Sequence, residues 1–443
     1  MQLKRGLVLC LGFALAAWPA LAGNGHMLHG FGPVNSSMAG AGAALALDPV
    51  GVLMFNPALL TTVEGNRVLF GSEFFEDGIE IEVNLDGGNG DRSGITKPSN
   101  QVGVLPSIGW TSHEPGSKFG YGFGLVAVAG FRTDYPADPD SILFDIPPAG
   151  FGRIYTDYRV TRIPVALGYQ ATDKLSVGIA LNAYLAELAI APLPHVVFDV
   201  PASDAGDPLA SDSRFYPQGG NLVSELSFSV QLGFHYEHSE KLSFGGSITT
   251  DQDYDPFTWN STIAYPELPP TGNFGAPREL DFDLDGPVNA TVGVGYQPND
   301  KTDIAFDVMW IEYDGVAGFG SPGGIVDRIV FPFGWRNVWV YKTGIQYQMN
   351  EKLTVRAGYN YSDIPIRQEV VLTATGAPAM FKHHFTAGLG LKLSESLTAE
   401  AAFYVVPRES VTGPFPDLDN NVLGTMTTSN ELTSVLMGLS WNF

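Results

Sequence analysis

Cysteine, charge and long hydrophobic runs are all scarce in this 443-residue sequence. Its single cysteine is Cys10, so the rest of the chain can form neither a disulfide framework nor a thiolate site. Only 16% of the residues are charged, against about 25% in ordinary globular chains. The 24 basic residues are outnumbered by 47 acidic ones. Because phosphate recognition needs clustered Lys and Arg, this composition excludes a nucleic-acid partner.

The one long hydrophobic run lies at the N-terminus. It extends from Leu7 to Trp18, follows Lys4 and Arg5, and precedes the sequence Ala20-Leu21-Ala22. A basic start, a short apolar core and an A-x-A site are typical of a secretory signal peptide, and the run is too short to span a bilayer. We therefore expect residues 1–22 to be removed. An exported, apolar chain without spanning helices can still cross a membrane as a closed β-barrel.

Alternation of apolar and polar residues supports the barrel. At the C-terminus, Val435, Met437, Leu439, Trp441 and Phe443 share one face of a predicted strand. The other face carries Ser434, Gly438, Ser440 and Asn442. Similar alternation recurs along the chain, with no helical segment that could cover the apolar faces. Apolar residues outside and polar residues inside are typical of an outer-membrane barrel.

The connections between these strands predict their number. Six short polar turns alternate with seven long segments rich in Pro, Asp and Gly. The long segments are 76–101, 131–157, 188–222, 251–287, 314–335, 364–382 and 407–431. This pattern predicts an all-β fold, a 14-stranded antiparallel transmembrane barrel over residues 67–443, with both ends on the short-turn side. A β-propeller would repeat its hairpins at a fixed period, but Tyr169, Tyr236, Tyr296 and Tyr347 are 67, 60 and 51 residues apart.

Residues 23–66 precede the first strand and do not alternate. They contain a small-residue run from Ser36 to Ala44, then Asp48-Pro49, then Asn56-Pro57-Ala58-Leu59. This segment resembles the N-terminal hatch of the FadL/OmpP1/TodX family, the outer-membrane transporters of long-chain fatty acids and related hydrophobic compounds. Two further resemblances are the hairpin around Arg356-Ala357-Gly358-Tyr359 and the strand opening His383-His384-Phe385-Thr386.

The resemblance implies passive uptake of long-chain fatty acids, alkanes or aromatic hydrocarbons across the Gram-negative outer membrane. It implies that residues 23–66 plug the lumen, with Asn56, Pro57 and Ala58 as the hatch turn. It also implies a monomer without cofactors that contacts outer-membrane lipid and lipopolysaccharide. The terminal Phe443 would be recognised by the barrel-assembly machinery.

Two sets of residues are candidates for the transport path. The family opens laterally at its third strand, where this chain has Gly120, Gly122 and Gly124 on one face, although these glycines could merely thin the wall. The third and fourth long segments carry apolar clusters suited to a capture groove, or to packing of the two segments on each other. The groove candidates are Leu188, Ile190, Phe198, Phe257 and Trp259.

Lumen-facing cations could recognise a carboxylate. Lys342 and Arg356 fall on inward positions of one hairpin, where they could bind a fatty-acid headgroup or instead neutralise Asp303, Asp307 or Glu400. His384 is a third candidate ligand contact. We predict no metal site, since His383 with His384 lacks further ligands and the acidic run from Asp281 to Gly286 lacks the Glu that a calcium loop requires.

Other functions have weaker support. The sequence contains no GxSxG, HExxH or Walker motif. We therefore expect no catalytic residues. A general porin remains the main alternative, and an outer-membrane enzyme or adhesion barrel is a further one.

Overall fold

A computed structural model describes most of the chain. The described residues are 23–86, 92–99, 102–141, 143–144, 150–195, 199, 216–262, 276–320, 322–327 and 329–443. The predicted signal peptide, residues 1–22, and Phe198 of the predicted groove lie outside them. Within these ranges, no helix is long and apolar enough to cross a membrane.

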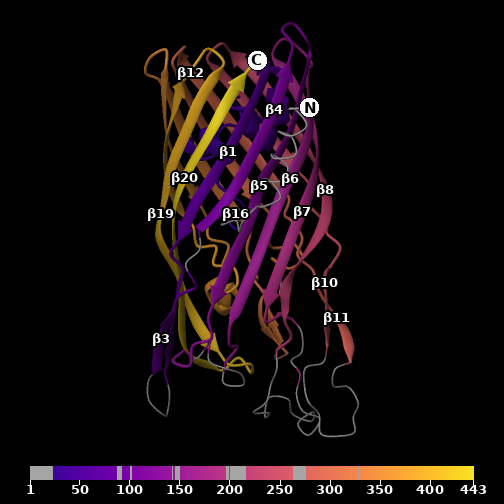
Figure 1. Ribbon diagram of the computed structural model, residues 1–443, viewed down its shortest axis with the longest axis vertical. Coiled ribbons are helices and arrows are strands. Elements are labelled where there is room, and N and C mark those ends of the chain that lie inside the picture. The colour runs from indigo at the N-terminus through magenta and orange to yellow at the C-terminus, as the bar shows by residue number, and fades with distance from the viewer. Residues whose placement is uncertain are drawn as a thin grey trace, which may run out of the picture.

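Fourteen antiparallel strands form a closed barrel (Figure 1). In order around the barrel they are β1 (Gly65–Asp77), β4 (Val102–His113), β5 (Phe119–Tyr135), β6 (Ile154–Gln170), β7 (Leu175–Ala191), β8 (Gly219–Ser239), β9 (Leu242–Thr249), β12 (Asn289–Asn299), β13 (Thr302–Ile311), β16 (Val338–Gln348), β17 (Leu353–Ser362), β18 (His383–Lys392), β19 (Leu397–Pro416) and β20 (Val422–Asn442). The barrel closes where β1 pairs with β20, with Val68 opposite Trp441. The predicted 14-stranded architecture is confirmed.

Side chains alternate across the barrel wall as the sequence predicted. On β20, Val435, Met437 and Leu439 are exposed, whereas Ser434 and Leu436 are buried. Large exposed apolar residues recur in the same way on the other strands. These residues form the outward apolar surface that faces lipid in a membrane barrel.

Several strands are longer than predicted. Because residues 407–431 were predicted to be a loop, the thirteenth strand was expected to end at residue 406 and the last strand to start at residue 432. In the structure, β19 continues to Pro416 and β20 begins at Val422. β2 (Glu80–Leu85) pairs with this part of β20 and with β3 (Arg92–Thr96). The outer ends of β19 and β20 are therefore stabilised by backbone pairing with each other and with β2. Local sequence patterns do not reveal pairing between segments that are distant in the chain.

Shorter elements lie at the long-loop end of the barrel, opposite the short turns (Figure 1). They are β10 (Phe257–Thr262), β11 (Pro277–Phe282), β14 (Gly324–Val326), β15 (Ile329–Phe331) and the 3-10 helix η4 (Gln368–Ala374). They occupy segments that the sequence predicted as loops. β10 pairs with β11, and β14 pairs with β15, as two small separate sheets.

The N-terminal segment, residues 23–64, forms two short helices and a 3-10 turn. These are α2 (Gly32–Ser37), α3 (Pro49–Phe55) and η1 (Pro57–Thr61). α3 starts at a proline, and the Asp48 carboxylate caps it by accepting from the Val50 and Gly51 amides at 2.8 and 2.9 Å. Residues of this segment are almost all buried, and they contact strands from β1 to β20 around the barrel. The barrel wall therefore surrounds the segment.

Candidate functional site

The turn formed by Asn56, Pro57 and Ala58 is tied to the barrel wall. The Asn56 side-chain amide donates to the carbonyls of Ala43 and Phe234, each at 2.8 Å. Its carbonyl oxygen accepts from the Ala58 amide at 3.1 Å. Pro57 starts η1 without leaving an unpaired amide, because proline has none. One side chain therefore holds the turn in shape and anchors it to β8.

A row of glycines receives this turn. Gly120, Gly168, Gly178 and Gly233 lie opposite one another on β5, β6, β7 and β8. A methyl group on Gly178 would collide with the backbone of Pro57 and Ala58, and one on Gly233 would collide with the Asn56 side chain. The missing side chains allow the N-terminal segment to lie directly against the wall.

The predicted opening residues Gly120, Gly122 and Gly124 face this segment. A methyl group on Gly120 would meet Leu60, and one on Gly122 would meet Leu53 at 2.6 Å. Across this stretch β4 and β5 remain paired, with His113 opposite Gly120 and Gly109 opposite Gly124. The part of these glycines in a lateral opening stays a prediction.

The β4–β5 ladder ends a few residues further on. Its last pair is Ser107 with Val126, immediately after Pro106, which cannot donate to a ladder. Residues 126–131 of β5 are all buried, and the β5–β6 register shifts between Ala127 and Ala129. A strand with one face toward lipid would alternate in exposure, so β5 bends inward here.

The N-terminal segment pairs with β5 beyond the point where β4 stops pairing with it. The Leu28 amide donates to the Val128 carbonyl at 3.0 Å, and the Gly130 amide donates to the His26 carbonyl at 2.9 Å. Met27 pairs with Ala129 as an antiparallel bridge. Residues 26–28 therefore act as a short substitute strand that satisfies backbone groups at the break in the wall.

A small inner cavity adjoins this break. It has a volume of about 30 Å³ and is lined by His26, Met27, Val128, Ala129 and Tyr158, among others. Its volume exceeds what a single water needs, but it is far smaller than a ligand site. Any hydrophobic molecule passing here requires the surrounding side chains to move.

A larger outer cavity lies toward the long-loop end of the barrel. Its volume is about 280 Å³, and most of its lining side chains are apolar. The apolar lining includes Leu143, Phe151, Ile154, Ile190, Pro192, Leu193, Ile329, Val330, Phe333 and Leu372. The polar lining side chains are Thr156, His195, Tyr216, Asp327, Thr373 and Thr375. A pocket of this kind suits a small hydrophobic molecule.

One layer of aromatic rings separates the two cavities. The rings of this aromatic layer belong to His26, Phe131, Tyr158, Tyr313, Phe319, Phe333 and Trp335. Phe333 lines the outer cavity, and His26 lines the inner one. Phe319 lies between them, with its ring centroid 4.6 Å from His26 and 5.2 Å from Phe333.

The predicted groove residues that are described divide between this cavity and the packed loops. Ile190 lines the outer cavity. Leu188, Phe257 and Trp259 are buried but do not line the cavity. The Trp259 indole donates to the Asn221 carbonyl at 2.7 Å. A capture role for this set stays a prediction.

The predicted lumen cations each have protein partners. Arg356 donates to Glu400 at 2.8 Å and to Gln346 at 2.6 Å. Lys342 lies directly opposite Asp307 of β13, donates to the Gly40 carbonyl at 3.5 Å and lies 4.4 Å from the centroid of the Phe55 ring. His384 stacks on His29, with ring centroids 5.0 Å apart. Their ligand-binding role stays a prediction.

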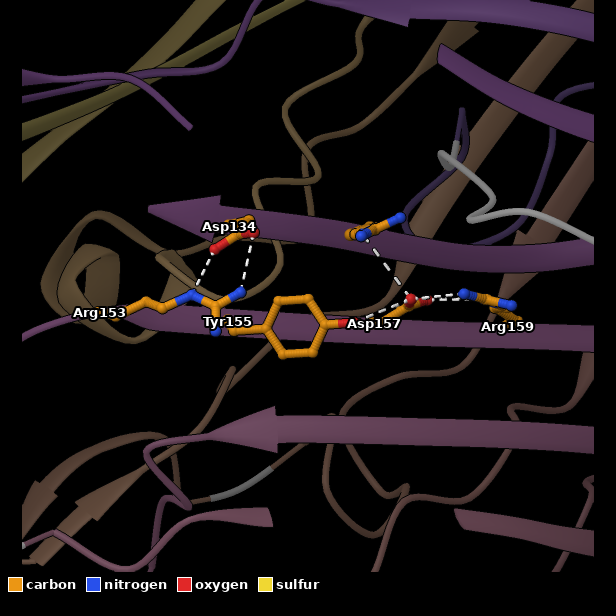
Figure 2. A network of polar contacts seen from close by, with 6 residues as sticks. Asp134, Arg153, Tyr155, Asp157 and Arg159 are labelled. Carbon is orange, nitrogen blue, oxygen red and sulfur yellow. Dashed lines mark hydrogen bonds and ion pairs between the residues drawn. The ribbon is translucent and has the colours of Figure 1, made fainter. Parts of the chain in front are cut away.

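A charged network joins β5 to β6 (Figure 2), and its side chains on β6 alternate with the cavity residues Ile154 and Thr156. Arg153 makes two hydrogen bonds to Asp134, at 2.7 and 2.9 Å. This pairing raises the pKa of the Arg153 guanidinium, so it stays charged. Asp157 accepts from Arg159 at 2.6 and 2.8 Å and from the Tyr155 hydroxyl at 3.2 Å. These cations are held away from the cavity.

Comparison with known proteins agrees with this geometry. A sequence model of the family described as outer membrane protein transport protein (OMPP1/FadL/TodX) matches residues 13–443. The chain belongs to the OMPP1/FadL/TodX family. Outer membrane protein P1 of Haemophilus influenzae is 20% identical over 91% of each chain.

Solved structures of the family share the fold. The Pseudomonas putida toluene transporter TodX superposes with a TM-score of 0.66 at 20% identity, covering 94% of this chain and 99% of that one. A Pseudomonas aeruginosa FadL homologue gives a TM-score of 0.71 at 16% identity, covering 95% and 100%. Membership of the OMPP1/FadL/TodX family makes this chain an outer-membrane transport protein, as predicted.

Sequence reasoning missed the residues at the break in the wall. Pro106 interrupts an otherwise strand-like segment, and this signal could have located the end of the β4–β5 ladder. The bulge near Val128 had no such signal, and neither had the pairing of Met27 with Ala129, which joins segments about a hundred residues apart.

Proposed function

We propose that this protein is a passive channel for hydrophobic small molecules, which enter at the outer cavity and leave sideways between β4 and β5. The observation that carries the proposal is the break in the wall after Val126, where residues 26–28 pair with β5. The inner cavity adjoins this break, and the outer cavity lies one aromatic layer away. An apolar molecule following this path avoids the aqueous lumen and enters lipid directly.

The N-terminal segment serves in this proposal as the hatch. We expect this segment, packed along the glycine row, to leave small polar solutes no open path. A general porin needs such a path, which makes that alternative less suitable. The related TodX is named a toluene transporter, and long-chain fatty acids and hydrocarbons are the candidate substrates here.

Assembly and surroundings complete the proposal. The Phe443 amide donates to the Asn66 carbonyl at 3.0 Å, next to the seam where β20 meets β1. We propose that this terminal strand is the signal for the barrel-assembly machinery. We also propose that the protein is a monomer surrounded by outer-membrane lipid and lipopolysaccharide.

A reversible cross-link tests the exit route. Met27 and Ala129 are paired residues, so cysteines at both positions suit a disulfide. The chain after residue 22 contains no other cysteine. In Gram-negative cells lacking their own homologues, oxidised Met27→Cys/Ala129→Cys should reduce uptake of radiolabelled naphthalene to the level of cells without the channel. Reduction should restore it.

A matched pair controls for oxidation. Thr412 and Thr427 face each other on the outer extension of β19 and β20, which are not the strands that border the break. Oxidised Thr412→Cys/Thr427→Cys should keep full uptake. Unchanged uptake through a fully cross-linked Met27–Ala129 channel would rule out this exit.

A further inference from the structure

We propose that three arginines on the outward side of β5 and β6, Arg132, Arg153 and Arg159, bind a phosphate group of lipid A, the membrane anchor of lipopolysaccharide. The inference rests on the proposed surroundings of the barrel, because it names where lipopolysaccharide contacts the wall. It does not depend on the transport route.

Arg159 points away from the lumen, because side chains alternate along β6. Thr156 lines the outer cavity and Arg162 lines the inner cavity, so the even-numbered residues of this strand face inward. Val165 and Tyr169 are 58% and 37% exposed on the opposite side, and Arg159 shares that side. In a membrane barrel this side faces lipid.

The cluster lies at the outer edge of the apolar band. Arg159 is ten residues from Tyr169, which lies beside a short turn. That separation is about 34 Å along a strand and about 26 Å along the barrel axis at a tilt of about 40°. The apolar band of such a barrel is about 25 Å tall, and its short turns are periplasmic. Arg159 therefore lies at the level of the outer-leaflet headgroups, where lipid A carries its phosphates.

One tyrosine holds two of the guanidinium groups together. Those of Arg132 and Arg153 lie over the Tyr155 ring, 5.8 and 5.0 Å from its centroid. Arg132 is in β5, and Arg153 immediately precedes β6, so the ring gathers cations from two strands. A cation–π contact uses the charge of a guanidinium and not its N–H groups, which stay able to donate to an anion.

The carboxylate of Asp157 lies beneath the arginines. Asp157 is between Tyr155 and Arg159 along the outward side of β6 (Figure 2). Its side chain is 1% exposed, whereas those of Arg132 and Arg159 are 25% and 22% exposed. Asp157 lies 3.7 Å from the Arg132 Nε, which is buried and has no hydrogen-bond partner among the described residues. The cluster therefore presents guanidinium groups to lipid and covers this carboxylate.

Positive charge is in excess at one end of the cluster. The three arginines share two aspartates, Asp134 and Asp157. The next carboxylate, Glu187 on β7, lies opposite Arg159. The excess is therefore at Arg132 and Arg153, and we place the phosphate there. Arg153 is 59% exposed, and exposed ion pairs are weak, so it can exchange Asp134 for a phosphate.

Lipid A matches both parts of this surface. A planar guanidinium donates two parallel hydrogen bonds to a phosphate, which suits the arginines. The acyl chains of the same molecule would lie along the outward residues below them. Those residues are Thr161, Ile163, Val165, Leu167 and Tyr169. Free phosphate would engage the arginines alone, so we assign the site to the lipid.

Native mass spectrometry tests the proposal with the full-length barrel, refolded without lipopolysaccharide and held in detergent with EDTA. EDTA removes divalent cations, so binding reports direct contact with the protein. The wild type should bind lipid A at least tenfold more tightly than dephosphorylated lipid A or phosphatidylglycerol. Arg132→Gln/Arg153→Gln should weaken lipid A binding at least tenfold and change binding of the dephosphorylated lipid by less than about twofold.

A matched variant controls for the loss of positive charge. Lys118→Gln/Lys174→Gln removes two exposed cations from the short turns that precede β5 and β7. It should keep the wild-type affinity for lipid A. Glu187→Gln leaves every arginine in place and removes a nearby negative charge, so it should tighten lipid A binding by about 2–3-fold. Heat-modifiability on gels verifies that each variant is folded.

Several results would overturn the inference. They are equal binding of lipid A and either comparison lipid, binding that is lost in EDTA, an unchanged affinity in Arg132→Gln/Arg153→Gln, an equal loss in the lysine variant, and no tightening in Glu187→Gln. None of them affects the transport proposal, because uptake through the cross-linked channel measures the exit route. A failure of that uptake test would in turn leave lipid A binding standing.

Discussion

Asn56 is joined to Phe234 by a hydrogen bond of 2.8 Å from its side-chain amide to the backbone carbonyl. The bond ties the N-terminal segment to β8 across 178 residues of sequence. Asn56 makes two further hydrogen bonds within its own segment, so this side chain fixes both the shape and the position of the turn.

Asn56→Ala should therefore loosen the hatch. The change removes three hydrogen bonds and leaves buried carbonyls unpaired, at about 1–3 kcal/mol for each group left unsatisfied. We expect increased permeability to small sugars in liposome swelling, with the barrel still folded. Asn350→Ala, in a short exposed turn, is the control and should remain tight. Equal swelling rates for the two variants would contradict the anchoring role.

Gly178→Val tests the glycine row. The new side chain would collide with Pro57 and Ala58, so the turn must leave the wall. We expect swelling rates close to those of a variant lacking residues 23–60. Gly220→Val is the control, because only the Ala191 side chain lies within 4 Å of a methyl group there. If Gly178→Val stays as impermeable as the wild type, close approach of the turn to the wall is not what seals the lumen.

Deletion of Trp441–Phe443 should prevent assembly. Trp441 pairs with Val68, and Phe443 donates to Asn66, so the deletion opens the seam between β1 and β20. Unpaired amides in lipid cost several kcal/mol each. We expect no heat-modifiable barrel in outer-membrane fractions. Phe443→Tyr keeps an aromatic end and should assemble normally, and a folded barrel from the truncated chain would refute the prediction.

The Arg356–Glu400 ion pair should be important for stability. Its side chains are only 7% and 6% exposed. Arg356→Gln leaves a buried carboxylate without its partner, which should lower the free energy of unfolding by about 3–5 kcal/mol in urea titrations followed by tryptophan fluorescence. Arg356→Gln combined with Glu400→Gln should recover much of this loss.

An exposed pair provides the comparison for that experiment. Arg153 and Asp134 interact at 2.7 Å, but the Arg153 side chain is 59% exposed. Arg153→Gln should change the free energy of unfolding by less than about 1 kcal/mol. A similar effect of the two arginine substitutions would mean that burial does not decide the strength of these pairs.

The sequence determined the membrane architecture. Alternation such as that from Val435 to Phe443, six short turns and the Asn56-Pro57-Ala58 turn were enough to predict a 14-stranded barrel with an N-terminal segment before it. These signals are local, because neighbouring side chains on a strand point to opposite faces and the bilayer makes one face apolar. The same alternation of side chains also predicted that Gly120, Gly122 and Gly124 face inward.

Tertiary structure alone decided where the cavities lie and what lines them. Gly376 lies so close to Thr156, some 220 residues away, that a methyl group on it would be 2.9 Å from the Thr156 hydroxyl. Arg356 is engaged because Glu400 lies beside it on another hairpin. The break in the wall is capped because Met27 pairs with Ala129. Each of these features depends on contacts between segments that are distant in the chain. The way in which the strands close around the N-terminal segment sets the geometry of these contacts, and no local sequence pattern encodes it.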